Sequence, residues 1–160
     1  MKASITTSKK KALTDIAVGR AKIRIFIRDE PHYQKDPKDG NTVTTRQLAK
    51  MLSIGFTNKQ GFEVPARPFM KQFRAANKED ILKILRFARA KGFQGWKAQQ
   101  QYQWAAEQIR DRLMTFLYTG QVTPANSPIT LKRKTGDAPL VDTEQLLYAI
   151  DTEVQYAPVK

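Results

Sequence analysis

The sequence predicts a single α+β domain over residues 1–160, and three observations point to it. Ile23, Ile25 and Ile27 alternate with charged or aromatic neighbours, which is the period-2 pattern of a strand with one apolar face. Two stretches with apolar residues at helical spacing follow over about 77–118, and the short glycine-bounded link between them predicts a helical hairpin. A length of 160 residues is typical of one domain.

The N-terminal quarter is expected to contain an arm, a helix, a strand and a loop. Residues 1–12 are polar and rich in lysine, and we interpret them as a basic, flexible N-terminal arm. A short helix is expected over Ala12–Val18, and the strand follows over Ala21–Arg28. Two prolines and an Asp-Gly pair mark residues 29–41 as a turn-rich loop.

The rest of the chain is predicted to be mainly helical. Apolar spacing, first-turn acids and glycine stops place the helix boundaries. The expected elements are, in chain order, a helix over Thr42–Ile54, a helix from the N-cap Asn77 to Gly92, a helix from about Trp96 to Tyr118, an irregular loop over Gly120–Pro139, a helix capped by Asp142 with Gln145 as capping-box partner, and a closing strand over Glu153–Val159. A long loop in a compact domain is usually functional or disordered, and we interpret residues 120–139 as a functional loop.

Several function classes are excluded or disfavoured by composition. The chain has no cysteine, which excludes disulfides and cysteine-bound zinc, and His32 is its only histidine. It contains no Gly-rich phosphate loop or nucleophile elbow, and the acids Glu79 and Asp80 are explained by the start of a helix. We therefore expect no enzymatic activity, no cofactor and no metal. No stretch approaches the roughly 18 apolar residues of a membrane span, and no apolar signal core begins the chain, so no membrane partner and no cleaved export signal are expected.

The charge balance favours an acidic partner. The chain carries 28 Lys and Arg residues against 15 acids, a net charge of +13. Such a charge suits nucleic acid, an acidic protein face or an anionic membrane. The excess is uneven, because Lys9, Lys10 and Lys11 lie in the basic arm whereas the chain after residue 135 is mainly acidic. Copies of such a molecule attract one another head to tail, and ordinary solvated charge is the alternative explanation for each cluster.

The segment Val64–Met70 is a proline-stiffened corner. Pro65 and Pro68 each fix φ, remove a donor and favour an extended residue before them. Arg67 is therefore held close to two rigid residues, and Phe69 supplies an apolar anchor where the next helix begins. Two interpretations stay open. Arg67 is presented to a neighbouring subunit, with acids of the C-terminal part as its expected partners, or it lies inside a buried strand-to-helix corner.

A second proline-rich segment runs from Pro124 to Leu147. It contains Thr130 and the compact basic cluster of Lys132, Arg133 and Lys134, and it leads into the expected cap at Asp142. One interpretation is that the cluster faces a partner protein or the path of DNA. The other is a flexible, solvated loop.

Together these features resemble the neck, or tail-completion, proteins of tailed bacteriophages, which join head to tail. The resemblance covers roughly residues 20–158. It consists of a strand, a loop with Asp-Gly, a helix, the Pro-Ala-Arg-Pro-Phe corner, a helical pair, and a Thr-x-x-x-Lys loop before Pro-Leu-x-Asp-Thr. Arg67 sits in the first motif of the family, and Thr130, Lys134 and Asp142 sit in the second. The chain departs by having Glu144 where these proteins often have glycine, and Glu suits a first helical turn.

The resemblance implies a small, curved, mainly antiparallel sheet packed with helices, and a structural role without catalysis. It implies a homo-oligomeric ring, hexameric or dodecameric, in the neck of the virion after synthesis in the host cytoplasm. The implied partners are the connector or adaptor protein, the tail-terminator or tail-tube protein, and double-stranded DNA in the channel. The residues expected at a subunit or partner interface are Pro65, Arg67, Pro68, Phe69, Thr130, Lys132, Arg133, Lys134 and Asp142. Those expected to face DNA are Lys9, Lys10, Lys11, Lys132, Arg133 and Lys134.

The main alternative is a basic nucleic-acid-binding accessory protein. It is weakened because Trp96, Tyr102 and Trp104 follow a helical pattern and not that of a strand used as a stacking platform. The two classes differ in what they predict. Affinity of a DNA-binding protein falls steeply with salt, whereas a ring protein assembles or binds a partner protein.

Overall fold

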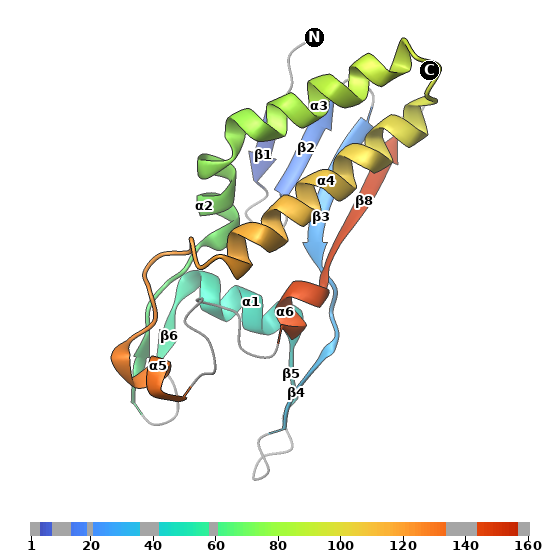
Figure 1. Cartoon of the computed structure of the whole chain (residues 1–160). Coiled ribbons are helices and arrows are strands. Elements are labelled where there is room, and N and C mark those ends of the chain that lie inside the picture. The colour runs from blue at the N-terminus through green and yellow to red at the C-terminus, as the bar shows by residue number, and fades with distance from the viewer. Residues whose placement is uncertain are drawn as a thin grey trace.

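A computed structural model of the chain confirms the α+β class with a helical hairpin packed on an antiparallel sheet. It describes residues 4–7, 14–18, 21–35, 42–57, 61–133 and 144–156. Figure 1 shows two layers, with helices α3 and α4 crossing one face of a four-stranded sheet. The strands of that sheet lie side by side in the order β1 (Ser4–Thr7), β2 (Thr14–Val18), β3 (Ala21–Ile27) and β8 (Ile150–Tyr156).

Strand β3 lies inside the sheet, between β2 and β8, and one of its two faces is buried. Ile23, Ile25 and Ile27 are at most 2% exposed, whereas the alternate residues are half-buried. β3 pairs with β8 along its whole length, and Ile23 lies opposite Val154 in that register. The alternation seen in the sequence therefore reports directly which face carries the helices.

The helical hairpin consists of α3 (Lys78–Gly92) and α4 (Ala98–Tyr118). Buried apolar side chains recur on both helices at helical spacing, as expected. Asn77 occupies the N-cap position of α3, as predicted, but its side chain makes no capping hydrogen bond there. The side-chain amide of Asn77 donates to the carbonyl of Phe73 at 3.1 Å, and its oxygen accepts from Arg112 at 3.2 Å. Asn77 thus ends the preceding helix, α2 (Phe69–Ala76), and ties it to α4.

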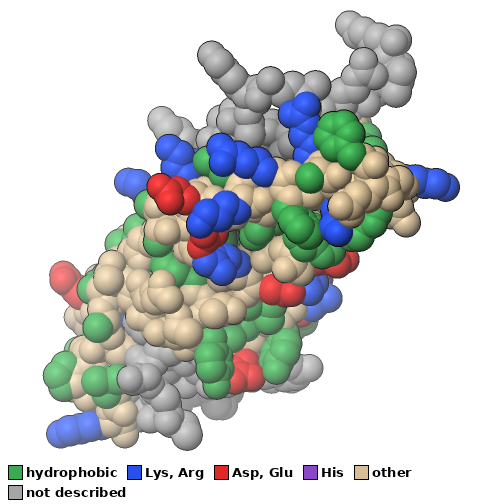
Figure 2. Space-filling view, turned by 45° about the horizontal axis from the view of Figure 1, so that its top comes forward, with side chains coloured by type: hydrophobic (Ala, Val, Ile, Leu, Met, Phe, Trp, Pro, Cys, Tyr) green, Lys and Arg blue, Asp and Glu red, His purple; other side chains and the backbone are tan. Residues whose placement is uncertain are grey.

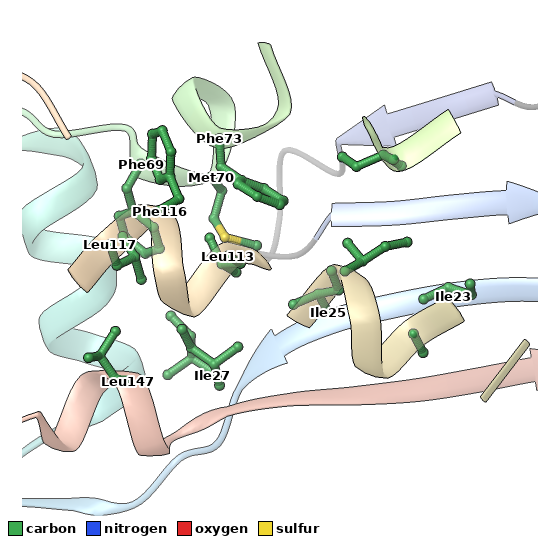
Figure 3. Close-up of a cluster of buried hydrophobic side chains, with 14 of the residues drawn as sticks. Ile23, Ile25, Ile27, Phe69, Met70, Phe73, Leu113, Phe116, Leu117 and Leu147 are labelled. Atoms are coloured by element: carbon green, nitrogen blue, oxygen red, sulfur yellow. The ribbon is translucent and has the colours of Figure 1, made fainter. Parts of the chain in front are cut away.

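The core extends from the sheet to the short helices. Figure 3 shows side chains from α2, α4, β3 and α6 (Gln145–Tyr148) meeting in one apolar cluster. Phe73 and Phe116 pack edge to face, with ring centres 5.7 Å apart. Phe69 is completely buried in this cluster.

Part of the expected flexible arm, residues 4–7, forms strand β1 and pairs with β2. Two further expectations for the N-terminal part are wrong. Residues 14–18 form strand β2 instead of a helix, because Ile16 pairs with Ile23 and completes the sheet. Pairing with a distant strand overrides a weak local preference. The turn-rich loop contains a strand, β4 (Pro31–Lys35), which pairs with β5 (Thr42–Thr44). The next helix, α1 (Thr45–Ile54), begins after Thr44, whose hydroxyl caps it in a capping box with Gln47.

The segment after Gly120 is more ordered than expected. Val122 is 1% exposed, and a six-residue helix, α5 (Pro128–Arg133), follows. The last helix begins at Gln145, so the expected N-cap at Asp142 is also wrong, and Asp142 itself lies outside the described residues. Glu144 occupies the N-cap position in a left-handed conformation, with φ 58°. This turn places Leu146 and Leu147 in the core.

The closing strand was predicted at Glu153–Val159. The structure places β8 three residues earlier, at Ile150–Tyr156. Two short strands, β6 (Phe56–Thr57) and β7 (Glu63–Val64), form a separate pair next to α1. Within the described residues, no helix combines the length and apolar character needed to cross a membrane.

Candidate interaction surface

The two proline-rich segments, far apart in the sequence, are joined by Arg67. Its guanidinium donates from Nε to the carbonyl of Pro124 at 2.8 Å, and from a terminal nitrogen to the carbonyl of Ala125 at 3.1 Å. A planar guanidinium is suited to hold two acceptors at once. We call the contact region formed by Pro65–Phe69 and Thr123–Ala125 the proline junction.

A second pair of hydrogen bonds closes the proline junction. The side-chain amide of Gln72 donates to the carbonyl of Thr123 at 2.6 Å and accepts from the Thr123 N–H at 2.9 Å. The backbone N–H of Arg67 also donates to the carbonyl of Leu52 at 2.8 Å, which ties the corner to α1. The junction therefore fixes three elements, α1, α2 and the start of the second proline-rich segment, relative to one another.

The structure decides between the two interpretations of Arg67. The residue is only 6% exposed, and its guanidinium is bonded within the same chain. Burial lowers the pKa of Arg67 below its ordinary value, because removal from water disfavours the charged form. The expectation that Arg67 is presented to a neighbouring subunit is therefore wrong. Arg67 is an internal brace, and the physical reason is that two backbone carbonyls of the second segment lie within its reach.

The other expected interface residues differ in accessibility. Phe69 is buried in the core, so it anchors the corner and does not reach a partner. Pro68 is half-buried, whereas Pro65 and Lys132 are exposed. Thr130 and Arg133 belong to α5, and only the backbone of these two residues is described. The expected residues that lie outside the described part of the chain are Lys9, Lys10, Lys11, Lys134 and Asp142.

The proline junction presents α5 at one end of the molecule. Figure 1 shows α5 away from the sheet, beside β6 and below α1. On α5, Leu131 is 42% exposed and the neighbouring Lys132 is exposed. Leu131 and Lys132 therefore place one apolar and one charged side chain on the surface at this end.

A strand pair extends from the same end. Figure 1 shows β4 and β5 reaching away from the body of the molecule. The base of the pair is fixed, because the Thr45 N–H donates to the carbonyl of Glu30 at 2.8 Å and the Thr45 hydroxyl donates to the carbonyl of Arg28. Asp29 and Arg46 form an ion pair of 3.5 Å beside it. An isolated two-stranded pair is marginally stable in water, so a neighbour that covers it would stabilise it.

The helical face is strongly basic. Figure 2 shows more basic than acidic side chains on the surface turned toward the viewer. Asp80 is one of the acids of α3, and it forms ion pairs with Lys83 at 3.3 Å and with Arg112. The exposed cations of α2 and α3 are Lys71, Lys78, Lys83, Arg86 and Arg89.

At the opposite end, the hairpin carries an aromatic hollow that the sequence interpretation missed. Its volume is about 300 Å³, and its lining residues are Trp96, Gln100, Gln103, Trp104 and Glu107. We call this site the aromatic hollow. The signal was present in the spacing, since these positions recur at three or four residues along one side of a helix. It was overlooked because aromatic residues at helical spacing usually belong to a core.

The described residues hold no group of three or more His, Cys, Asp or Glu side chains that could bind a metal ion. Comparison with protein families, with curated proteins and with solved structures finds no significant match for this chain.

Proposed function

We propose that the protein is a structural subunit of a ring in the neck of a tailed bacteriophage, where it joins the head connector to the tail. The observation that carries the proposal is the proline junction. The first motif that resembles this family takes part in it, and Arg67 bonds Pro124 and Ala125, a few residues before Thr130, where the second motif begins. The junction therefore holds the first motif next to the stretch of chain that leads into the second.

The backbone at Glu144 supports the same proposal. Neck proteins often have glycine at this position, and this chain has glutamate. The position has φ 58°, in the left-handed region that favours glycine. The earlier explanation, that Glu144 suits a first helical turn, is wrong, because the residue precedes the helix in a non-helical conformation. The Tyr148 hydroxyl donates to the Glu144 carboxylate at 3.1 Å, which helps to hold glutamate there.

In the proposed ring, copies of the chain contact one another and the adjacent virion proteins through the end that carries α5 and the β4–β5 pair. Exposed Leu131 and Lys132 supply apolar contact and charge at that end. A hexamer or dodecamer, an adaptor on one side, and a tail-terminator or tail-tube protein on the other belong to the proposal. So does sequence-independent contact with DNA in the channel, because the net charge of +13 suits a polyanion. The role is structural and located in the virion.

The test is assembly of the purified protein. Sedimentation velocity over a concentration series, with electron microscopy of the largest species, should show a closed oligomer of six or twelve copies. Substitution of Lys132, Arg133 and Lys134 by Gln should slow assembly and change its salt dependence, because charges at the rim of an interface mainly alter association. The flanking genes give a second measurement, since portal and tail-tube genes are expected beside the coding sequence.

The matched control removes three other exposed cations, Lys71, Lys78 and Arg86, from α2 and α3. This variant loses the same net charge and should assemble as the unmodified protein does. Equal loss of assembly in both variants would mean that only net charge matters. A protein that remains monomeric at high concentration, encoded away from virion genes, would refute the proposed function.

A further inference from the structure

The aromatic hollow has a shape that admits a flat ring. The ring centres of Trp96 and Trp104 are 6.4 Å apart, and the ring planes are inclined at 79°, so the two indoles form two walls of a corner. The volume of about 300 Å³ lies at the lower end of the range for small-ligand sites, roughly 300–1,000 Å³. Gln100, Gln103 and Glu107 complete its lining. The Gln103 amide donates to the Glu107 carboxylate at 3.0 Å, and the Gln100 amide oxygen accepts from the Lys97 N–H at 2.9 Å.

The surroundings of the hollow are cationic. Lys91 Nζ lies 5.0 Å from the centre of the Phe87 ring and 5.7 Å from that of Trp96, so one cation bridges two aromatic faces. Lys97 is exposed at the start of α4. Residues 81–106 contain no Asp or Glu. Their basic residues are Lys83, Arg86, Arg89, Lys91 and Lys97.

We infer that the aromatic hollow binds a base of single-stranded nucleic acid. The base stacks on the indole of Trp96, and Lys91 and Lys97 attract the phosphates on either side of it. The N–H groups that these bonds leave on the Gln100 and Gln103 amides donate to the edge of the base. Stacking on aromatic side chains within a positive surface is how proteins bind single strands with little sequence preference.

A single strand fits this site better than a duplex. Bases of a duplex are paired and stacked on one another, so none is free to stack on Trp96. The site is also unlike the strand platform that the sequence interpretation required for stacking, because here a helix and the turn before it carry the rings. The inference does not depend on the proposed ring, since the hollow lies at the other end of the hairpin from the proline junction.

An anionic bilayer is the competing occupant. Phe93 is 90% exposed at the hairpin turn and has Lys91 and Lys97 nearby in the sequence, a composition found at membrane surfaces. One ring at a turn buries little area in lipid. The two indoles, in contrast, line a hollow, and a hollow is suited to one flat base and not to the extended surface of a bilayer.

The intrinsic tryptophan fluorescence of the protein reports on this site, because both of its tryptophans line the hollow. The experiment titrates the protein with single-stranded oligo(dT) of about 12 nucleotides, a length within the usual range of single-strand sites. Stacking should quench tryptophan fluorescence. The same length of duplex, and vesicles of phosphatidylcholine with phosphatidylserine, serve as competing probes. Neither is expected to quench at comparable concentration.

Trp96→Ser should weaken binding about tenfold or more, and Trp96→Phe should retain most of it, because stacking on a base is worth about that factor. Tyr118→Ser is the matched control, since Tyr118 is an exposed aromatic at the far end of α4. Lys97→Gln should lower the slope of log affinity against log salt by about 0.7, whereas Lys50→Gln on α1 should leave it unchanged. Lys97 is on the surface, so this variant tests the site even where Trp96→Ser fails to fold.

Absence of quenching by the single strand would overturn the inference. Quenching by vesicles alone would also overturn it. Equal affinity for duplex and single strand would do the same, if Trp96→Ser and Lys97→Gln left both affinities unchanged. Failure of the proposed ring can be told apart from failure of this inference. The variant in which Gln replaces Lys132, Arg133 and Lys134 should still bind the single strand, and its loss of affinity should be purely electrostatic and smaller than that of Trp96→Ser.

Discussion

Replacement of Arg67 by alanine should detach the second proline-rich segment from the body of the protein. The substitution removes the hydrogen bonds to the carbonyls of Pro124 and Ala125. Bonds from charged donors contribute about 1.5–3 kcal/mol each. The lower value applies here, because Pro124 and Ala125 are exposed and their free carbonyls can bond water. The expected loss is therefore about 3 kcal/mol, which corresponds to a fall in melting temperature of roughly 6–12 °C for a domain of this size.

Arg67→Lys separates geometry from charge. Lysine keeps the charge but cannot hold both carbonyls in the fork of a guanidinium, so about half of the loss should remain. Urea unfolding followed by circular dichroism gives the free energy of unfolding. Hydrogen exchange of the peptide around Val122 shows whether the segment opens before the core does. Arg86→Ala is the control, since Arg86 is exposed on α3 and its removal should change stability by less than about 0.5 kcal/mol.

If Arg67→Ala left both stability and the exchange of the segment unchanged while abolishing assembly, Arg67 would be a contact between subunits. The internal brace would then be refuted, and the discarded interpretation of the sequence would be restored.

Three further predictions concern charge and backbone. The hydrogen bond from Lys83 and the nearby Arg112 lower the pKa of Asp80, so this carboxylate stabilises the fold above its unfolded pKa and loses the effect as pH falls through the folded one. Asp80→Asn should therefore be less stable than the unmodified protein in urea at neutral pH, and the difference should vanish in strong acid. Gly55→Ala should lower the free energy of unfolding by more than about 2 kcal/mol in thermal unfolding, because φ is +75° and the new Cβ would lie 2.8 Å from a backbone nitrogen. Gly61→Ala, at φ +80° with open space around the new Cβ, should lower it by about 1 kcal/mol. Glu144→Val should lose about 1–2 kcal/mol in the same assay while Glu144→Gly loses none, and equal losses would contradict the left-handed conformation at this position.

The elements that sequence alone predicted well are those whose burial is periodic. Ile23, Ile25 and Ile27 alternate because β3 has one buried face, and α3 and α4 show helical spacing because each packs one side on the sheet. In these cases the local pattern is a direct record of the tertiary contact. The hairpin and the central strand could be predicted for that reason.

Elements that depend on a distant partner could not be predicted in the same way. Residues 14–18 are a strand because β3 lies beside them, and a short segment carries little evidence of a neighbour. The corner at Arg67 was recognised as rigid, because prolines act locally. The direction of the guanidinium could not be predicted, since it depends on Pro124, 57 residues further along the chain. The cap at Asp142 failed for a similar reason, because burial of Leu146 and Leu147 sets where the last helix begins.

Helix α4 connects the two surfaces of this protein and keeps them apart. It has 21 residues, and at about 1.5 Å per residue it spans roughly 30 Å between the aromatic hollow and the residues that lead into the proline junction. Substitutions this far apart should act additively on stability. The two activities are nevertheless connected in an assembly, because a ring multiplies the number of hollows within reach of one strand. Linked sites bind far more tightly than separate ones. Variants that abolish the ring should therefore reduce affinity for long single strands and leave affinity for short oligonucleotides almost unchanged.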